Sequence, residues 1–438
     1  GFRKVSGMAK TFRPYVPEQD SLLPPSLRDW LPADHLAYFV GDLVDQLDLT
    51  AITEPYEEEE RGFPPYHPVM LTKVLLYAYC VGVFSSRKIQ RRLAEDVAFR
   101  VLAAGNAPDF RTIADFRRRH LVALEALFLQ VLRLAREAGA ATVGRVAIDG
   151  SKVRANASKH KAMSYGRMVE KERQLVQEVK HWLTQAEATD AQEDAQHGRD
   201  RRGDELPEEL RRRDTRLKRI REAKRVLEER AKAEAPAPPS DDAAKPVTPK
   251  AKAQSNFTDP ESRIMKGPDG FVQAYNAQIA VDETCQFIVG QAVTQEVNER
   301  QLVPMIETVT AQAGETPGEV LADNGYCSEA NLQYVREQAI DAYIATGRLK
   351  HDAPLPPARG RIPKSATLMD RMRRKLRTKP GAAVYSRRKS IVEPVFGQIK
   401  HARGFRQFLL RGLDKVRGEW SLICLTHNIL KCYGLIYG

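Results

Sequence analysis

Apolar residues recur at helical spacing through the first third of the chain. Between residues 26 and 139 they repeat the i, i+3, i+4, i+7 pattern of one helix face. Two stripes show it most clearly: Leu71, Val74, Leu75 and Ala78, and then Leu124, Leu127, Val131 and Leu134. The preceding stretch is interrupted by prolines, which predicts an extended segment. We therefore expect an extended N-terminal arm over residues 1–24 and an all-helical domain over residues 25–138.

The apolar pattern becomes strand-like after residue 139. Five short stretches have the length and alternation of strands: 145–149, 271–280, 286–293, 320–323 and 341–345. Between them, Asn298 and Ser328 are placed to cap helices, and the last helices contain Glu393 and residues 420–433. This order of elements is that of an RNase H-like domain. The sequence thus predicts an α/β fold with a mixed five-stranded sheet and flanking helices, built from residues 139–158 and 256–438.

A charged segment interrupts this pattern between residues 159 and 255. It carries two apolar seams at helical spacing, formed by Met168, Leu175, Val179, Trp182 and Leu183, and by Leu217, Ile220, Ala223 and Leu227. Residues 233–249 are rich in Ala, Pro and Lys, a composition typical of a linker. We expect an antiparallel helical hairpin, inserted after the first strand and followed by a linker.

Positive charge is concentrated in one part of the chain. The formal net charge is +12, with an isoelectric point near 9.4. Residues 359–406 contain fifteen Lys or Arg and two acids, a net +13, so the rest of the chain is close to neutral. A solubilising surface normally mixes the two signs. One basic block instead indicates a nucleic-acid partner, because neutralised phosphates release counterions.

A second group of basic residues lies in the helical domain. Arg117 and Arg118 follow a helix start at which Thr112 is placed to cap. Short, Arg-bearing helices suit a helix-turn-helix-like DNA-binding module, in which these two arginines contact DNA. The alternative is an ordinary helical bundle whose arginines form a solvated face.

Cysteine usage and hydropathy exclude several protein classes. The five cysteines form no C-x-x-C pair, so we expect neither a zinc site nor a disulfide framework. The longest apolar stretch, residues 74–84, is shorter than the roughly 20 residues that span a bilayer. Residues 1–10 are charged without an apolar core, so no secretory signal is expected there. These features favour a cytoplasmic protein that does not contact membranes.

Three carboxylates occupy positions where a site is expected. Asp149 ends the first predicted strand, and Asp323 ends the fourth, just before the turn residues Asn324 and Gly325. Sites in open sheets form at the carboxyl ends of strands, where these two acids would converge. Glu393, the only acid in the basic block besides Asp370, would complete the set from a late helix. Each acid also has a structural explanation, as a turn residue or, for Glu393, as a partner of a neighbouring arginine.

Oxygen ligands of this kind predict a particular metal chemistry. Carboxylates suit Mg²⁺ or Mn²⁺ better than zinc, which prefers nitrogen and sulfur. Two such ions about 4 Å apart promote in-line phosphoryl transfer. In that arrangement Asp149 bridges two Mg²⁺ ions, with Mn²⁺ as a substitute, while Asp323 and Glu393 each hold one.

The surroundings of these acids resemble one family. Residues 147–151 (Ala-Ile-Asp-Gly-Ser), 321–326 (Leu-Ala-Asp-Asn-Gly-Tyr) and 385–400 are similar to the motifs of bacterial insertion-sequence DDE transposases with a Tyr-Arg-Glu-Lys signature. Residues 258–263 and 270–278 also resemble this group, as does the stretch from 12 to 52. The resemblance covers nearly the whole chain apart from the charged insertion, and it implies an RNase H-like catalytic domain.

The signature departs from the family pattern at one point. The usual spacing leaves two residues between Tyr and Arg, three between Arg and Glu, and six between Glu and Lys. Tyr385, Glu393 and Lys400 fit, but four residues separate Arg388 from Glu393, so either Arg388 or Lys389 takes the Arg position. The resemblance implies that the basic and tyrosine members hold phosphates of the transposon end. Asn324 either supports the site or serves only the turn.

The resemblance also implies a reaction and its partners. A phosphodiester is hydrolysed at the element's end, and the freed 3′-OH then attacks target DNA. The partners are double-stranded DNA, as terminal inverted repeats and as target, and a second copy of the chain on paired ends, in association with the bacterial nucleoid. Two rivals stay open: an RNase H-like nuclease without strand transfer, and a transposase-derived DNA-binding protein that no longer cuts. For Asp259 a loop cap is expected rather than a catalytic role, and His427 with Asn428 are expected as a core pair.

Overall fold

A computed structural model describes residues 26–57, 64–158, 161–197, 208–234, 248–267, 270–296, 298–347 and 360–438. The predicted arm over residues 1–24 lies outside these residues, as does most of the predicted linker. No helix within the described ranges is long and apolar enough to cross a membrane. All five cysteines are free.

The N-terminal part is helical, as its apolar periodicity predicts. It consists of η1 (Leu27–Trp30), α1 (Leu36–Asp45), α2 (Thr50–Glu57), α3 (Pro68–Cys80), α4 (Ser86–Glu95), α5 (Val97–Leu102), α6 (Phe110–Arg119) and α7 (Leu121–Glu137). Both apolar stripes are largely buried, on α3 and α7. Thr112 is not the N-cap of α6, however. Asp109 is, because its Oδ1 accepts the Thr112 N–H at 2.7 Å, and a carboxylate satisfies such an N–H well.

A six-stranded sheet forms the centre of the molecule. Its strands are β1 (Arg145–Arg154), β4 (Arg263–Gly267), β5 (Gly270–Asp282), β6 (Ile288–Thr294), β7 (Glu319–Ala322) and β8 (Asp341–Ile344). β5 pairs antiparallel with β1 along one edge. Along its other edge it pairs with β4 and then β6, both antiparallel. β1, β7 and β8 run parallel. The mixed α/β prediction is confirmed.

The predicted number of five strands is wrong by one, because β4 was not expected. β4 is short, and its residues alternate between exposed and half-buried. Such an edge strand buries no apolar run, so periodicity gives little signal for it. Its pairing depends on a tight connection to β5, at which Gly270 has a φ of 101°.

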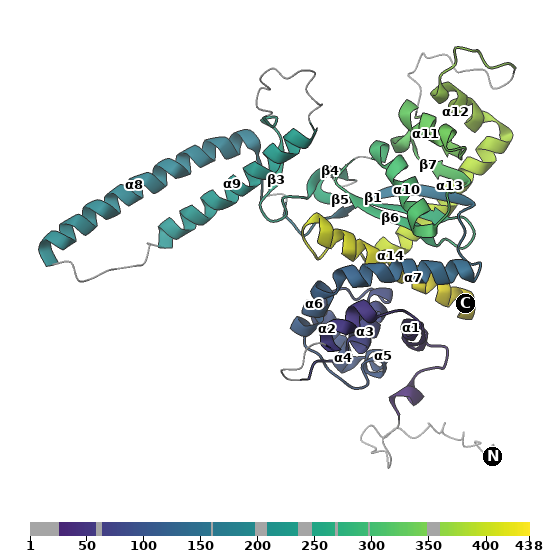
Figure 1. Ribbon diagram of the computed structural model, residues 1–438, viewed down its shortest axis with the longest axis horizontal. Helices are drawn as coiled ribbons and strands as arrows, with labels where there is room; N and C mark the ends of the chain where they lie inside the picture. Colours follow the sequence, from purple (N-terminus) through teal and green to yellow (C-terminus); the bar gives the residue numbers. More distant parts are fainter. Residues whose placement is uncertain are drawn as a thin grey trace, which may run out of the picture.

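Helices connect and cover the sheet (Figure 1). They are η3 (Asn298–Gln301), α10 (Leu302–Ala313), η4 (Asn324–Tyr326), α11 (Glu329–Glu337), α12 (Leu368–Arg377), α13 (Lys379–Gly397), the π-helix η5 (Gln398–Ala402) and α14 (Leu413–Tyr437). Ser328 caps α11 as predicted. Asn298 does not cap α10; its Oδ1 instead accepts hydrogen bonds from the Asn276 and Gln278 side chains.

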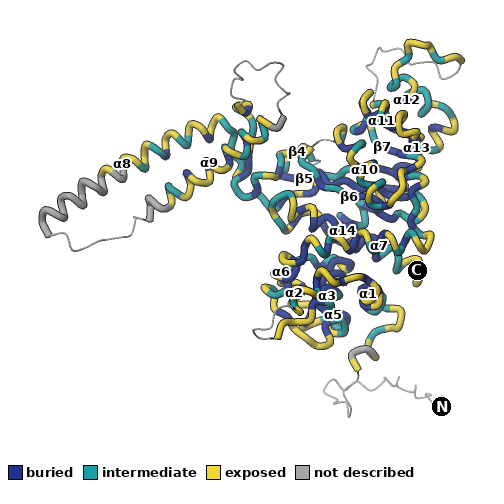
Figure 2. The backbone as a smooth tube through the Cα atoms, viewed as in Figure 1, coloured by how far each residue is buried: buried dark blue, intermediate teal, exposed yellow. Residues whose placement is uncertain are grey.

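α14 joins the sheet to the N-terminal helices. It packs on β6 from one side and on α7 and α3 from the other. The buried positions gather around the sheet and this helix (Figure 2). The predicted core pair is confirmed: Asn428 exchanges two hydrogen bonds of 2.9 Å with the backbone of Ile288, and His427 Nε2 lies 2.9 Å from the Gln286 carbonyl oxygen.

The charged insertion forms two long helices that extend away from the sheet (Figure 1). They are α8 (Tyr165–His197) and α9 (Glu208–Glu234), with a two-stranded sheet of β2 (Ala162–Ser164) and β3 (Gln254–Asn256) at their base. The two helices pack on each other through a small core that is separate from the main one. This core comprises Met168, Leu175, Leu217, Ile220, Ala223 and Leu227. The side chains of Trp182 and Leu183 lie outside the described residues.

Candidate active site

The structure brings two of the three predicted carboxylates together. Ile148 and Ala322 are the last paired residues of the parallel strands β1 and β7, so Asp149 and Asp323 follow them at neighbouring positions. Asp149 accepts a hydrogen bond from the Gly150 amide at 2.8 Å, and Asp323 accepts one from the Gly325 amide at 2.8 Å. Burial raises the pKa of Asp149, and the negative charge of Asp323 raises it further.

α13 supplies the third carboxylate and an arginine. Arg388 Nη1 lies 3.3 Å from Asp149 Oδ2, and Arg388 Nη2 lies 3.9 Å from Glu393 Oε1. The Arg388 side chain is 10% exposed, whereas that of Glu393 is 56% exposed. Lys389 is exposed on the same helix. The position of Arg388 between two acids therefore favours it over Lys389 as the arginine of the signature.

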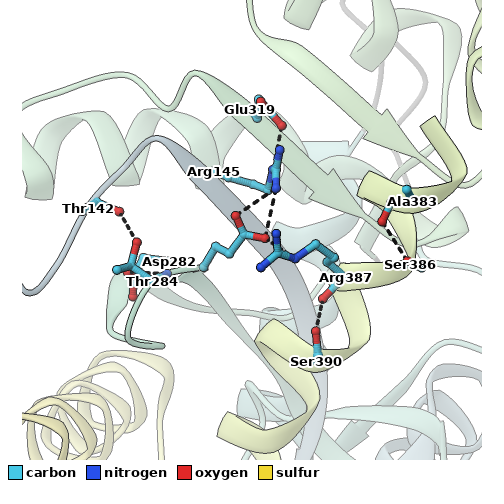
Figure 3. A network of polar contacts seen from close by, with 10 residues as sticks. Thr142, Arg145, Asp282, Thr284, Glu319, Ala383, Ser386, Arg387 and Ser390 are labelled. Carbon is cyan, nitrogen blue, oxygen red and sulfur yellow. Dashed lines mark hydrogen bonds and ion pairs between the residues drawn. The ribbon is translucent and has the colours of Figure 1, made fainter. Parts of the chain in front are cut away.

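A chain of ion pairs fixes α13 against the start of the strands. Arg387 Nε lies 2.7 Å from Glu283 Oε1, and the same carboxylate accepts from Arg145 at 2.9 Å. Arg145 in turn lies 2.7 Å from Glu319 on β7. Figure 3 shows Arg145 between Glu319 on one side and Arg387 on the other. Because Arg145 and Glu283 are mostly buried, the chain is screened less than a surface pair. These ion pairs hold the helix turn that carries Arg388 against β1 and β7.

Tyr385 and Lys400 lie on either side of Glu393 along the chain. Burial raises the pKa of Tyr385, while the positive charge of Arg388 opposes the rise. The Lys400 ammonium donates to Ser151 Oγ and, at 3.2 Å, to the Lys152 carbonyl oxygen. Burial lowers the pKa of Lys400, and the Asp149 charge opposes that shift. A cavity of about 720 Å³ adjoins this corner, lined among others by Gly150, Ser151, Lys152, Lys266 and Lys400.

Two family comparisons bear on this geometry. Residues 25–119 match the model described as a transposase domain (DUF772), and residues 360–433 match the model described as a transposase DDE domain. Both matched models describe transposase domains, and together they support an insertion-sequence DDE transposase. The second match includes Tyr385, Arg388, Glu393 and Lys400. Searches of curated proteins and of solved structures found no match.

DDE transposases generally use divalent metal ions. The donor set is composed of carboxylates, which suits Mg²⁺ or Mn²⁺. Within the described ranges, no three His, Cys, Asp or Glu side chains are grouped as metal ligands. The Arg388 guanidinium lies between Asp149 and Glu393 and its positive charge opposes their negative charges. The carboxylates fit a divalent metal ion in donor chemistry, and the side chain of Glu393 is more exposed than those of Asp149 and Asp323.

A buried polar network beneath the acids was not predicted from the sequence. The Tyr326 hydroxyl donates to Gln278 Oε1, and Gln278 Nε2 donates to Asn298 Oδ1 at 3.0 Å. Burial and the charges of Asp149 and Asp323 raise the pKa of Tyr326 far above its ordinary value, so this phenol stays protonated. A signal for the network existed, since Gln278 is a polar residue at a fully buried strand position. A Cβ on Gly150 would lie 2.0 Å from Gln278 Nε2, so only glycine fits there without rearrangement.

The remaining predicted residues differ in how far they are exposed to solvent. Asn324 is exposed beside Asp323, in the first turn after β7. Arg118 is exposed and pairs with Asp115 at 2.9 Å. The expectation that Arg117 contacts DNA is not supported, because Arg117 is buried and donates to Tyr79 Oη and the Phe84 carbonyl oxygen. Periodicity could not show this, since three successive arginines occupy three different faces of α6. Asp259 is a buried acceptor for Tyr275 and Gly412, in keeping with a structural role.

Proposed function

We propose that this chain is a DNA transposase that binds the ends of an insertion sequence, hydrolyses a phosphodiester bond there, and joins the freed 3′-OH to target DNA. Asp149, Asp323 and Glu393 are its proposed catalytic carboxylates. The observation that carries the proposal is that Asp149 and Asp323 directly follow the last paired residues of β1 and β7, with Arg388 linking Asp149 to Glu393. Asp149 lies within β1, which continues to Arg154 along β5, whereas Asp323 follows the end of β7. Neighbouring acids of this kind are costly to bury, which favours a function over a structural role.

We also propose that the sheet has the RNase H-like arrangement. Support comes from the strand order β6–β5–β1–β7–β8, in which β5 alone runs against β1. In this interpretation β4 extends the β6 edge. Residues 139–158 and 256–438 then form one catalytic domain, residues 25–138 a helical DNA-binding domain, and residues 159–255 an insertion.

The proposed reaction consists of two in-line displacements at phosphorus. In the first, a water oxygen bonds to phosphorus as the bond to the 3′-oxygen breaks, and the 3′-oxygen gains a proton. In the second, that 3′-OH attacks a target phosphodiester and the target's own 3′-oxygen leaves. Two Mg²⁺ ions, when bound by Asp149, Asp323 and Glu393, would supply charge neutralisation for both the attacking and the leaving oxygen.

The protein's own residues prepare the site for this substrate. Arg388 holds the charge of Asp149 before DNA arrives, and its burial keeps it at the site. Tyr326 and Gln278 support the backbone under the two aspartates from below. Lys400 and Tyr385 are proposed to hold phosphates of the transposon end, since they flank the acids and Lys400 borders the adjoining cavity. Lys389 and Arg118, both exposed, are proposed to contact the DNA backbone farther out. Asn324 is proposed to assist beside Asp323.

The deciding experiment is cleavage of DNA carrying the element ends, with Mg²⁺ or Mn²⁺, by wild type and by Glu393→Gln. The substitution keeps size and removes the charge, so we expect the rate to fall on the order of 10²-fold or more while DNA binding is retained. Glu307→Gln is the matched control, because Glu307 is an exposed glutamate on α10, outside the site.

The outcomes separate the proposal from its rivals. Cleavage and joining that fail only in Glu393→Gln support the transposase. Cleavage without joining of the 3′-OH to a second duplex identifies a nuclease. Wild type that binds DNA and never cuts it identifies a non-catalytic DNA-binding protein, and equal cutting by Glu393→Gln removes Glu393 from the site. Assembly of two copies on paired ends is expected, and it is measured by the mass of the complex in solution.

A further inference from the structure

A groove along the inserted hairpin carries charge that its own residues do not neutralise. The groove has a volume of about 700 Å³ and runs from the base of the hairpin onto α9. Its basic lining includes Lys161 beside β2, Arg167 in the first turn of α8, and Arg216 and Arg219 on α9. These four side chains are exposed, and none of them makes an ion pair with any residue in the described part of the chain.

The acids near the groove are already paired with other cations. Glu172 is held by Arg221 and Lys224, each at 3.0 Å. Glu178 pairs with Arg213 at 3.2 Å, and Asp214 pairs with Lys218 at 2.7 Å. The basic residues of the groove and those of the other faces thus differ in kind. Arg213, Arg221 and Lys224 link α9 to α8, and Lys218 is paired within α9, whereas the groove residues line an open cavity.

The rest of the lining suits a sugar–phosphate backbone. Thr215 and Thr258 contribute hydroxyl groups, and Met163, Ile220 and Phe257 contribute apolar surface. Arg216 and Arg219 lie three residues apart on one face of α9, about 4.5 Å along its axis. Arginine, lysine and threonine side chains make most protein contacts to DNA phosphates and sugars.

The groove is close to the candidate active site along the chain. Thr258 lines the groove, and Arg263, five residues later, lines the cavity beside Asp149 and Lys400. Five extended residues span at most about 18 Å. Because DNA rises 3.4 Å per base pair, that distance corresponds to roughly five base pairs. A duplex with one phosphate at the Arg263 edge of this cavity would therefore reach Thr258 of the groove within about half a helical turn.

We propose that this hairpin groove binds the phosphate backbone of double-stranded DNA next to the bond that is cut. Lys161, Arg216 and Arg219 are its main contacts, with Arg167 at its edge. The inference rests on the proposed function in one respect, the identity of the substrate as DNA. It assigns the insertion a role in holding the substrate rather than in the reaction itself.

The test compares two triple variants of equal charge. Lys161→Gln/Arg216→Gln/Arg219→Gln removes the groove cations. Lys218→Gln/Arg221→Gln/Arg225→Gln removes three cations of the same hairpin that are held by acids. The affinity for a fluorescent DNA duplex carrying an element end is measured by anisotropy across salt concentrations, and the circular dichroism of each variant verifies that the helices persist.

The expected effect follows from counterion release. Each lost phosphate contact lowers the slope of log affinity against log salt by about 0.9, so the groove variant should lose up to roughly 2.7. At about 0.15 M salt this corresponds to binding on the order of 10²-fold weaker. The control variant is expected to stay within about threefold of wild type. Cleavage at saturating DNA is expected to be unchanged in the control variant, because it removes neither a candidate site residue nor a groove residue.

The results distinguish this inference from the proposed function. Equal affinity and equal salt slope in the groove variant and wild type would overturn the groove as a DNA site, even if wild type cuts DNA. Equal losses in both triple variants would also overturn it, since net charge alone would then explain the effect. A selective loss in the groove variant supports it, even if wild type never cleaves and the catalytic proposal fails.

Discussion

Glu419→Gln is expected to change how the stability of this protein depends on pH. Glu419 lies on α14 and is fully buried. Its Oε2 accepts the amides of Leu409 and Leu410, both at 3.0 Å, which holds the segment between η5 and α14. That segment pairs with the end of β1, because the Phe408 amide donates to the Arg154 carbonyl oxygen. The perturbation therefore tests a support of the catalytic strand.

The magnitude follows from the pKa of Glu419. Burial raises this pKa from its ordinary 4.5 to about 6, although the two amides and Arg117 oppose the rise. A raised carboxyl pKa favours the folded state below pH 4.5, and this contribution is lost as pH rises through about 6. The ionised glutamate therefore costs the folded state roughly 2 kcal/mol at neutral pH, of which about 1.2 kcal/mol develops between pH 5 and 7.5. Because glutamine does not titrate, the free energy of unfolding of the variant does not carry this pH-dependent loss.

The assay is urea denaturation of wild type and Glu419→Gln at pH 5 and 7.5, followed by tryptophan fluorescence. Trp420 is buried next to Glu419 and reports on this part of the core. The stability of the variant relative to wild type is expected to improve by about 1.2 kcal/mol between the two pH values. Glu307→Gln, at an exposed position, should show no such change. A constant difference between Glu419→Gln and wild type across this range would refute the reasoning.

Two further substitutions test the site and its support. Gly150→Ala places a Cβ 2.0 Å from Gln278 Nε2 and 2.7 Å from Asn298 Oδ1. It should therefore destabilise the fold by about 1–3 kcal/mol and reduce DNA cleavage at least tenfold, while DNA is still bound. Unchanged cleavage would contradict the proposed role of the network. Asn428→Ala removes the hydrogen-bond partners of both the N–H and the carbonyl group of buried Ile288. The free energy of unfolding, measured by urea denaturation, should fall by about 2–4 kcal/mol. A fall of less than about 0.5 kcal/mol would show that these two hydrogen bonds are dispensable.

Much of the fold was predictable because it depends on local periodicity. The helical first third, the hairpin seams and five of the six sheet strands each bury an apolar face that their own sequence specifies. β4 was not predicted from the sequence, because an exposed edge strand lacks such an apolar face. The capping residues of α6 and α10 were misassigned for a related reason. Several polar residues near a helix start have similar propensities, and only the folded backbone selects one.

In the candidate site, too, local sequence determined some features and tertiary contacts determined others. The sequence correctly placed Asp323 just after a strand, because it follows a short apolar run and precedes a turn. The prediction that Asp149 ends its strand is wrong, because β1 continues to Arg154 by pairing with β5. The sequence did not decide between Arg388 and Lys389. Helix geometry favours Arg388, since adjacent residues on α13 point about 100° apart and Arg388 pairs with Asp149 while Lys389 is exposed.

The sequence by itself determined the fold class and the chemical groups that are present. These are an α/β fold with a helical insertion, a concentrated basic block, and acids at the ends of predicted strands. Tertiary structure alone decided which of these groups meet. Parallel pairing of β1 with β7 puts Asp149 beside Asp323 although 174 residues separate them, and burial converts Arg117 from a candidate DNA contact into a core residue. The physical reason is that local patterns record which face of an element is apolar, whereas contact between distant polar groups depends on strand register and helix orientation.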